Sequence, residues 1–330
     1  MRRTTIVVAL VLALVVGAGT GEGLGAAAST ATAQNVLNAA QEIRSACSYL
    51  ESNYENSTGL VRETPTLDRF FLYSDNYLAA RVLSNGCDNP GLAESINRTL
   101  SRYDASRFPN QYMAFDCKGP FFGGSEDYRV SGDVWTTVNN QSGTPLNDGY
   151  ADIAFLRAYY YVECANNPPA AIAAFDAGAS EYVGVGFDDA PFLVGQSAGV
   201  YQTYKLALYV YTAELLNQTA PLGALVSMAR MQNSTTGGFY TGYDANLTPV
   251  GTTNTETTCL SIMALVAAFG HTVPKSSTPV SLTFIASVWA IAVVATVIAL
   301  VVLAVKASSR PANDEQSSTK GASESHQSGA

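Results

Sequence analysis

The chain has 330 residues, of which 27 are acidic and 18 are basic, and its formal net charge at pH 7 is −9. The basic residues are scattered rather than clustered, so we do not expect a nucleic acid as partner. The two histidines, His271 and His326, both lie near the C-terminus, which excludes histidine-dependent catalysis and histidine-ligated metal sites from the rest of the chain.

The N-terminus has the three parts of a secretory signal peptide. Arg2 and Arg3 provide the positive start, and Thr4 to Val16 is apolar and uncharged. Small residues then lead to an A-x-A site that ends at Ala33. The sequence therefore predicts a signal peptide over residues 1–33 and an exported mature chain.

Residues 34–275 are predicted to form one extracytoplasmic domain, which is long enough to bury a core of its own. Apolar residues recur at helical spacing through most of it, and strand-like alternation is confined to short pieces. We therefore expect an all-α domain. The predicted helices are Val36 to Tyr54, Asn76 to Ser84, Gly91 to Tyr103, Tyr150 to Cys164, Ala170 to Tyr182, Val200 to Leu216, Ala224 to Met231 and Thr257 to Phe269.

Four of the predicted helices open in the same way, with polar residues that run directly into an Ala- and Leu-rich stretch. Each opening follows a loop that is rich in aromatic residues and often in glycine. Repeated loops before repeated helices are expected to gather at one end of an array, which is the natural place for a site. The four openings are Ser74 to Ala80, Asn147 to Ala154, Tyr201 to Ala207 and Asn254 to Leu260.

The C-terminal part of the chain predicts a membrane anchor. After a linker at residues 276–281, residues 282–305 are uncharged and apolar, and they suit a helix that crosses the roughly 30 Å hydrocarbon layer. Lys306, Arg310 and Lys320 follow, so the positive-inside rule places the disordered tail, residues 306–330, in the cytoplasm. We therefore expect a single-pass type I protein of the cell membrane, with the lipid bilayer as partner and the main domain extracellular.

The alternation of outer and inner helices, with a turn such as Gly237-Gly238-Phe239 before an inner helix, resembles the α/α-toroid proteins, most of all the six-hairpin glycosidase-like group. The resemblance covers Gln34 to Gly270 and rests on architecture. It implies an α/α-toroid or a partial (α/α) barrel of helical hairpins. Four hairpins are clear, so either the ring is incomplete or two more lie within Ser106 to Thr144. Terpenoid-cyclase-like and complement-like toroids use the same turns without hydrolase activity.

Carboxylates near the helix openings are the candidates for acid and base chemistry. Glycoside hydrolysis needs one protonated acid and one base or nucleophile. Asp152 is the preferred candidate, because it is expected inside a helix, where capping does not explain it. Asp75 and Glu256 stand in first helical turns, where capping is the alternative role. The candidate catalytic residues are Asp152, Asp75, Asp189, Asp244 and Glu256.

Aromatic side chains around the same openings offer flat apolar surfaces on which a sugar ring can stack. Lys205 is expected to pair with a carboxylate rather than to act as a nucleophile. Asp188 and Asp189 belong either to a plain surface loop or to a weak Ca²⁺ site. No P-loop or GxGxxG motif occurs, so no nucleotide and no other cofactor is expected. The predicted substrate-binding residues are Tyr77, Trp135, Tyr150, Tyr201, Tyr204, Lys205, Phe239, Tyr240 and Tyr243.

All five cysteines lie in the exported part of the chain, where disulfides persist. Four paired cysteines allow three connectivities, and we favour Cys47 with Cys87 and Cys117 with Cys164 because each pair joins neighbouring segments. Cys259 is then a buried free thiol. Six N-x-S/T sequons are candidate glycosylation sites and agree with an outward-facing domain: Asn56, Asn97, Asn140, Asn217, Asn233 and Asn246.

Two functions fit these features. The first is a membrane-anchored extracellular carbohydrate-active domain with glycoside hydrolase-like acid and base chemistry on a polysaccharide, and lyase chemistry is a variant of it. The second is a non-catalytic surface or envelope protein that binds a glycan or a protein. They differ in one feature, because an enzyme needs two carboxyl groups that face each other about 5 to 10 Å apart across a cleft.

Overall fold

The computed structural model describes residues 38–67, 70–103, 109–118, 125–139, 149–194 and 198–270. The predicted signal peptide, linker, membrane span and cytoplasmic tail lie outside these residues, as does the sequon at Asn140. Within the described ranges, no helix combines the length and the apolar character that a membrane crossing requires.

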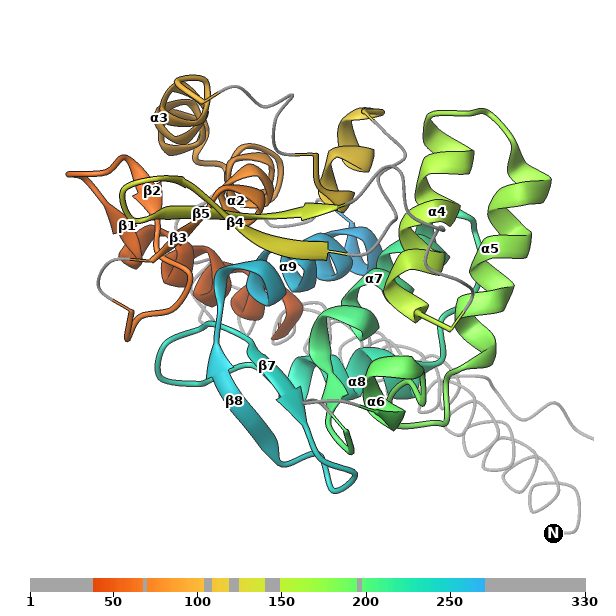
Figure 1. Ribbon diagram of the computed structural model, residues 1–330. Helices are drawn as coiled ribbons and strands as arrows, with labels where there is room; N and C mark the ends of the chain where they lie inside the picture. The colour runs from red at the N-terminus through yellow and green to blue at the C-terminus, as the bar shows by residue number, and fades with distance from the viewer. Residues whose placement is uncertain are drawn as a thin grey trace, which may run out of the picture. The chain divides into compact units, whose positions relative to one another are not determined.

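The long helices lie close to their predicted positions (Figure 1). Asparagine side chains cap several of them: Asn89, Asn167 and Asn254 each accept a hydrogen bond from a backbone N–H of the helix that follows. Residues 38–52 are helical. The other helices are α2 (Tyr73–Asn85), α3 (Pro90–Leu100), the 3₁₀ helix η2 (Gln111–Asp116), α4 (Ala151–Glu163), α5 (Pro168–Ser180), α6 (Ala190–Leu193), α7 (Thr203–Leu215), α8 (Leu222–Arg230) and α9 (Thr255–Phe269).

The predicted all-α class is wrong, because the described chain contains three small sheets as well as helices. Most of the strands are too short to show the alternation of apolar and polar residues by which a strand is recognised in a sequence. The sheets are β1 (Tyr54–Glu55) with β2 (Leu60–Val61); β3 (Phe71–Leu72), β5 (Val134–Asn139) and β4 (Ser125–Ser131); and β6 (Tyr201–Gln202), β7 (Tyr240–Tyr243) and β8 (Pro249–Thr253).

The four helices with similar openings pack side by side in the order α2, α9, α7, α4. A second helix packs on three of them: α3 on α2, α5 on α4 and α8 on α7. Three of the four predicted hairpins are therefore present, but the predicted toroid is wrong, since the described residues show no closed ring. Where two more hairpins were possible, residues 109–118 and 125–139 contain η2 and the antiparallel strands β4 and β5.

The short strands align the openings of the helices. β3 runs directly into α2, β6 into α7 and β8 towards α9. β6 and β8 both pair with β7, so the starts of α7 and α9 are held in one sheet. The strands therefore bring together the first turns of helices that are far apart in the sequence.

The Gly237-Gly238 turn lies directly against the helix at residues 38–52. Gly237 has a φ of +83°, and a Cβ atom there would lie 2.1 Å from the carbonyl oxygen of Ser45. A Cβ atom on Gly238 would lie 2.4 Å from the ring of Tyr49. Only glycine allows this approach, which seats Phe239 fully inside the core.

Both predicted disulfides are confirmed. Cys47–Cys87 joins the helix at residues 38–52 to the segment after α2, and Cys117–Cys164 joins the end of η2 to the end of α4. Cys259 is a buried free thiol. Two disulfides suit an oxidising compartment such as the secretory pathway or the cell exterior.

Substitution of Gly238 by alanine is expected to destabilise the fold by about 1–3 kcal/mol, because the new methyl group overlaps the fully buried ring of Tyr49. Gly91→Ala is the matched control, since a Cβ atom there meets no atom within 4 Å in the first turn of α3. Urea unfolding measures both. Equal stabilities for the two variants would contradict the close packing of the turn.

Candidate functional site

The first turns of the four inner helices meet and carry ionisable side chains to one place. Asp75 comes from α2, Asp152 from α4, Lys205 from α7 and Glu256 from α9. Asp75, Asp152 and Lys205 are at most 6% exposed, whereas Glu256 is partly exposed. Four of the five predicted catalytic carboxylates thus lie in one cluster, since Asp189 joins these three through Lys205, the lysine that was expected to pair with a carboxylate.

Lys205 forms the centre of one half of the cluster. Its ammonium lies 2.5 Å from Asp189 Oδ2 and 4.0 Å from Asp152 Oδ1. Asp189 Oδ2 also accepts a 3.1 Å hydrogen bond from the backbone N–H of Ala151, the first residue of α4. Asp189 therefore neutralises the lysine and at the same time satisfies the N-terminus of the helix that carries Asp152.

Asp152 has a different environment from Asp189, although both are buried. Burial raises the pKa of Asp152, and the Lys205 charge opposes that rise. The Tyr204 hydroxyl lies 3.4 Å from Asp152 Oδ2 and 3.1 Å from Gln202 Oε1, so its one hydrogen serves two acceptors. Burial followed by the charge of Asp152 raises the pKa of Tyr204 well above its usual range, so this phenol stays a donor.

Glu256 forms the other half of the cluster. Burial, then the negative charge of Asp75, raises its pKa to about 8, and the charge of Asp152 adds to the rise. The Tyr112 hydroxyl donates a hydrogen bond to Glu256 Oε1. Because of the raised pKa, Glu256 is largely protonated at neutral pH, whereas an ordinary glutamic acid is ionised.

A further acid, Glu63, lies behind Asp75. Its Oε1 accepts a 2.8 Å hydrogen bond from Asn254 Nδ2, and burial raises its pKa to about 7. Neither Glu63 nor Tyr112 was identified from the sequence. Glu63 lies in a segment without regular periodicity, and Tyr112 is one of many aromatics. The Asn110 cap of η2 is the local signal that marks the segment of Tyr112.

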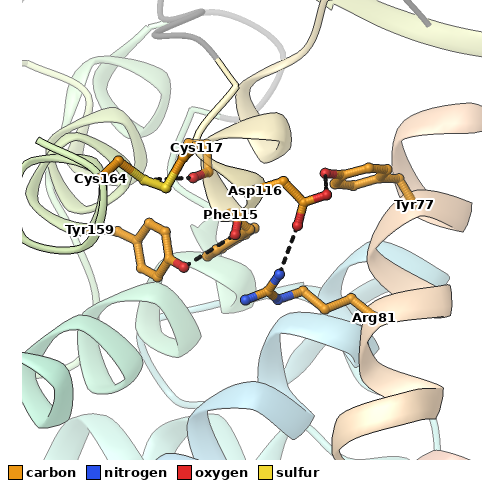
Figure 2. Close-up of a disulfide and its surroundings, with 8 residues drawn as sticks. Tyr77, Arg81, Phe115, Asp116, Cys117, Tyr159 and Cys164 are labelled. Atoms are coloured by element: carbon orange, nitrogen blue, oxygen red, sulfur yellow. Dashed lines mark hydrogen bonds and ion pairs between the residues drawn. A yellow bond between two sulfur atoms is a disulfide. The ribbon is translucent and has the colours of Figure 1, made fainter.

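The short helix η2 brings Tyr112 to the cluster. It is held to the rest of the protein on two sides (Figure 2). The Cys117–Cys164 disulfide connects it to α4. Asp116 accepts hydrogen bonds from the Tyr77 hydroxyl and, at 3.0 Å, from Arg81 of α2. Tyr77, predicted to bind substrate, therefore holds η2 in place in this structure.

Asp244 is the one candidate catalytic residue that lies outside the cluster. It occupies the exposed turn between β7 and β8, where its Oδ1 accepts hydrogen bonds from the N–H groups of Asn246 and Thr248 at 2.8 and 2.9 Å. These bonds lower its pKa. The role of Asp244 in this structure is therefore to stabilise the turn.

Several predicted sugar-stacking aromatics pack within the protein. Phe239 and Tyr243 are fully buried, and the Tyr243 hydroxyl donates to the carbonyl of Val185. Tyr201 stacks on Phe192 with ring centroids 4.4 Å apart. Three further aromatics are partly exposed: Trp135, which packs near Phe70; Tyr150, which precedes α4; and Tyr240, which accepts a hydrogen bond from Asn233.

Two other places in the protein are candidates for ligand binding. A cavity of about 370 Å³ lies between the C-terminal halves of α2, α7 and α9 and is lined by Arg81, Tyr211 and Met263 among others, away from the carboxylates. No group of three metal-ligating side chains converges within the described ranges. At the Asp188-Asp189 pair considered for Ca²⁺, Asp189 binds Lys205.

Comparisons of the chain with protein-family models, with curated proteins and with solved structures found no match.

Substitution of Lys205 by methionine is expected to destabilise the protein by about 3–5 kcal/mol, because it leaves Asp189 ionised and buried without a counter-charge. The double variant Lys205→Met/Asp189→Asn should recover part of this loss. Arg98→Met is the control, because the Arg98–Glu94 pair is exposed and should change stability by less than about 0.5 kcal/mol. Similar losses for Lys205→Met and Arg98→Met in urea unfolding at pH 7 would contradict a buried ion pair.

Proposed function

We propose that this protein is an extracytoplasmic carbohydrate-active protein, anchored by residues 282–305 with its domain outside, in which Glu256 is the general acid and Asp152 the second carboxylate. Glycoside hydrolysis needs two carboxyl groups in opposite protonation states. The site offers two acids, one from α9 and one from α4, whose surroundings differ. Glu256 faces a phenol and other acids, and Asp152 faces an ammonium.

The single observation that carries the proposal is that Glu256 is hydrogen-bonded to Tyr112 in the half of the cluster without a cation, whereas Asp152 lies beside the Lys205 ammonium. A pKa of about 8 lets Glu256 donate a proton to a leaving oxygen at neutral pH. Burial raises the pKa of Asp152, and Lys205 opposes that rise, so the lysine favours the ionised form that a base or nucleophile requires. Such differently tuned pairs are the usual mark of acid and base assignments.

The surroundings of Glu256 also suit a polar, ring-shaped ligand. Glu256 and Tyr204 are partly exposed, while the groups behind them are buried. Tyr204 combines an aromatic face with a hydroxyl held at Asp152, and Gln202 adds an amide. A sugar presents an apolar ring face and several hydroxyls, which match these groups.

The exported location is supported by the two disulfides and by sequons at the surface. Asn56, Asn97, Asn217 and Asn246 are exposed and are the proposed glycosylation sites. Asn233 differs, because its side-chain nitrogen, the atom that would carry a glycan, donates a 2.8 Å hydrogen bond to Tyr240.

The test is sugar release from a panel of polysaccharides by the purified protein and by Glu256→Gln and Asp152→Asn. We expect each substitution to reduce turnover by about 10²–10⁴-fold, since each removes one of the two required proton-transfer or charge roles. Asp244→Asn is the matched control, because this exposed turn carboxylate lies outside the cluster, and it should retain turnover.

Two outcomes would overturn the enzymatic proposal. Equal turnover in all variants would show that residues other than Glu256 and Asp152 carry the activity. Polysaccharide binding without turnover in wild type would instead favour a surface glycan receptor that uses the same aromatic and polar groups.

A further inference from the structure

Behind the proposed acid lies a second pair of carboxyl groups, Glu63 and Asp75, for which the proposed reaction has no use. Asp75 is 2% exposed and Glu63 is 9% exposed. Their side chains hydrogen-bond to each other. Two ionised carboxylates only accept hydrogen bonds, so this contact requires a proton on one of the two groups.

We propose that Glu63 and Asp75 share one proton at neutral pH and act together as positioning residues for the first turn of α9. The shared proton does not depend on the proposed function. The consequence for Glu256 as an acid does rest on the proposed function.

The other contacts of the two side chains leave one oxygen on each for the shared proton. Glu63 Oε1 accepts from Asn254, and Asp75 Oδ1 accepts from the Ser74 hydroxyl at 3.0 Å. The backbone N–H of Glu256 also donates to Asp75. Glu63 Oε2 and Asp75 Oδ2 are buried, and no donor among the described residues hydrogen-bonds to either oxygen. Such buried oxygens are costly unless they bond to each other through a proton.

The pair connects three parts of the chain at the start of α9. Glu63 binds the side chain of Asn254, whose Oδ1 caps α9 through the N–H of Thr257 at 2.9 Å. The carbonyl of Glu63 accepts a 2.9 Å hydrogen bond from the N–H of Thr255. Asp75 belongs to α2. Loss of the shared proton would place two negative charges in contact below Glu256 and loosen all three connections.

The groups around the pair favour retention of the proton. Glu256 and Cys259 of α9 face it, as does Tyr49 of the helix at residues 38–52. The cation of the cluster, Lys205, is bound to Asp189 and Asp152 in the other half. Burial and the neighbouring acid raise the pKa of Asp75 well above its usual range and that of Glu63 to about 7.

The sign of the pH dependence follows from these shifts. A carboxyl whose pKa is higher in the folded than in the unfolded protein contributes stability that is fully present below the unfolded pKa, near 4, and is lost as the pH rises through the folded pKa. The folded protein should therefore become less stable between pH 5 and pH 8.

The experiment measures the thermal midpoint of the full chain from pH 5 to pH 9 for wild type, Glu63→Gln and Asp75→Asn. We expect the wild-type midpoint to fall by about 3 °C or more. Each amide variant carries a permanent N–H donor where the proton was, so it should lose less between pH 5 and pH 8. Glu94→Gln, an exposed carboxylate on α3, is the control and should follow wild type.

A second measurement keeps the test decisive if one variant folds poorly. Infrared difference spectra should show a protonated carboxyl band in wild type at pH 7 that is weakened in whichever of the two amide variants folds. Unchanged spectra together with parallel pH curves in wild type and both variants would overturn the shared proton.

The role at Glu256 has its own readout. Asp75→Asn removes the charge that Asp75 gains when the pair loses its proton, so the alkaline limb of the pH–rate profile should move to lower pH. An unmoved limb would overturn the positioning role. Altered pH curves in a protein without turnover would refute the proposed function and leave the shared proton standing.

Discussion

The constraint on which the site depends is the burial of several acids around one buried cation. Lys205 lies within reach of Asp189 and Asp152, and it compensates that half of the cluster. The acids of the other half must be protonated or hydrogen-bonded, because an unpaired buried charge costs several kcal/mol. The division of the cluster into an ionic half and a proton-holding half thus follows from where the lysine is. That asymmetry is what separates Glu256 from Asp152 chemically.

The helices and most of the cluster could be predicted from the sequence because they depend on local signals. Helical periodicity located the helices to within a few residues. Glu256 was expected in a first helical turn and lies there, whereas Asp152 was selected as a residue inside its helix and in fact lies in the first turn of α4, because the helix begins at Ala151. The repeated helix openings correctly indicated that these residues lie close together. They did not justify the prediction of a closed ring. The same repeat is satisfied by an arc of helices whose openings are aligned by short strands.

The remaining parts depend on contacts between distant segments, which no local pattern encodes. β3 is two residues long and pairs with β5, more than sixty residues later. Tyr112 meets Glu256 across a separation of 144 residues, and Glu63 meets Asn254 across 191. For the aromatic residues, proximity in the sequence led to a wrong prediction of the site. Phe239 and Tyr243 stand beside the expected site in the sequence, but their apolar area is buried in the core, as is common for large aromatic side chains.

The position of η2 sets the condition for any ligand that reaches Glu256. The Tyr112 hydroxyl already occupies Oε1 of that side chain, so an incoming hydroxyl must replace this hydrogen bond or use the other oxygen. Replacement is inexpensive only if Tyr112 keeps a partner, because a buried phenol without one is destabilising. η2 itself stays attached, since Cys117 forms a disulfide with Cys164 at the end of α4 and Asp116 binds Arg81 of α2. Exchange at Glu256 therefore calls for a rotation of the Tyr112 side chain rather than a release of the segment. A ligand hydroxyl that both donates to Glu256 and accepts from Tyr112 meets this condition, and sugar hydroxyls can do both.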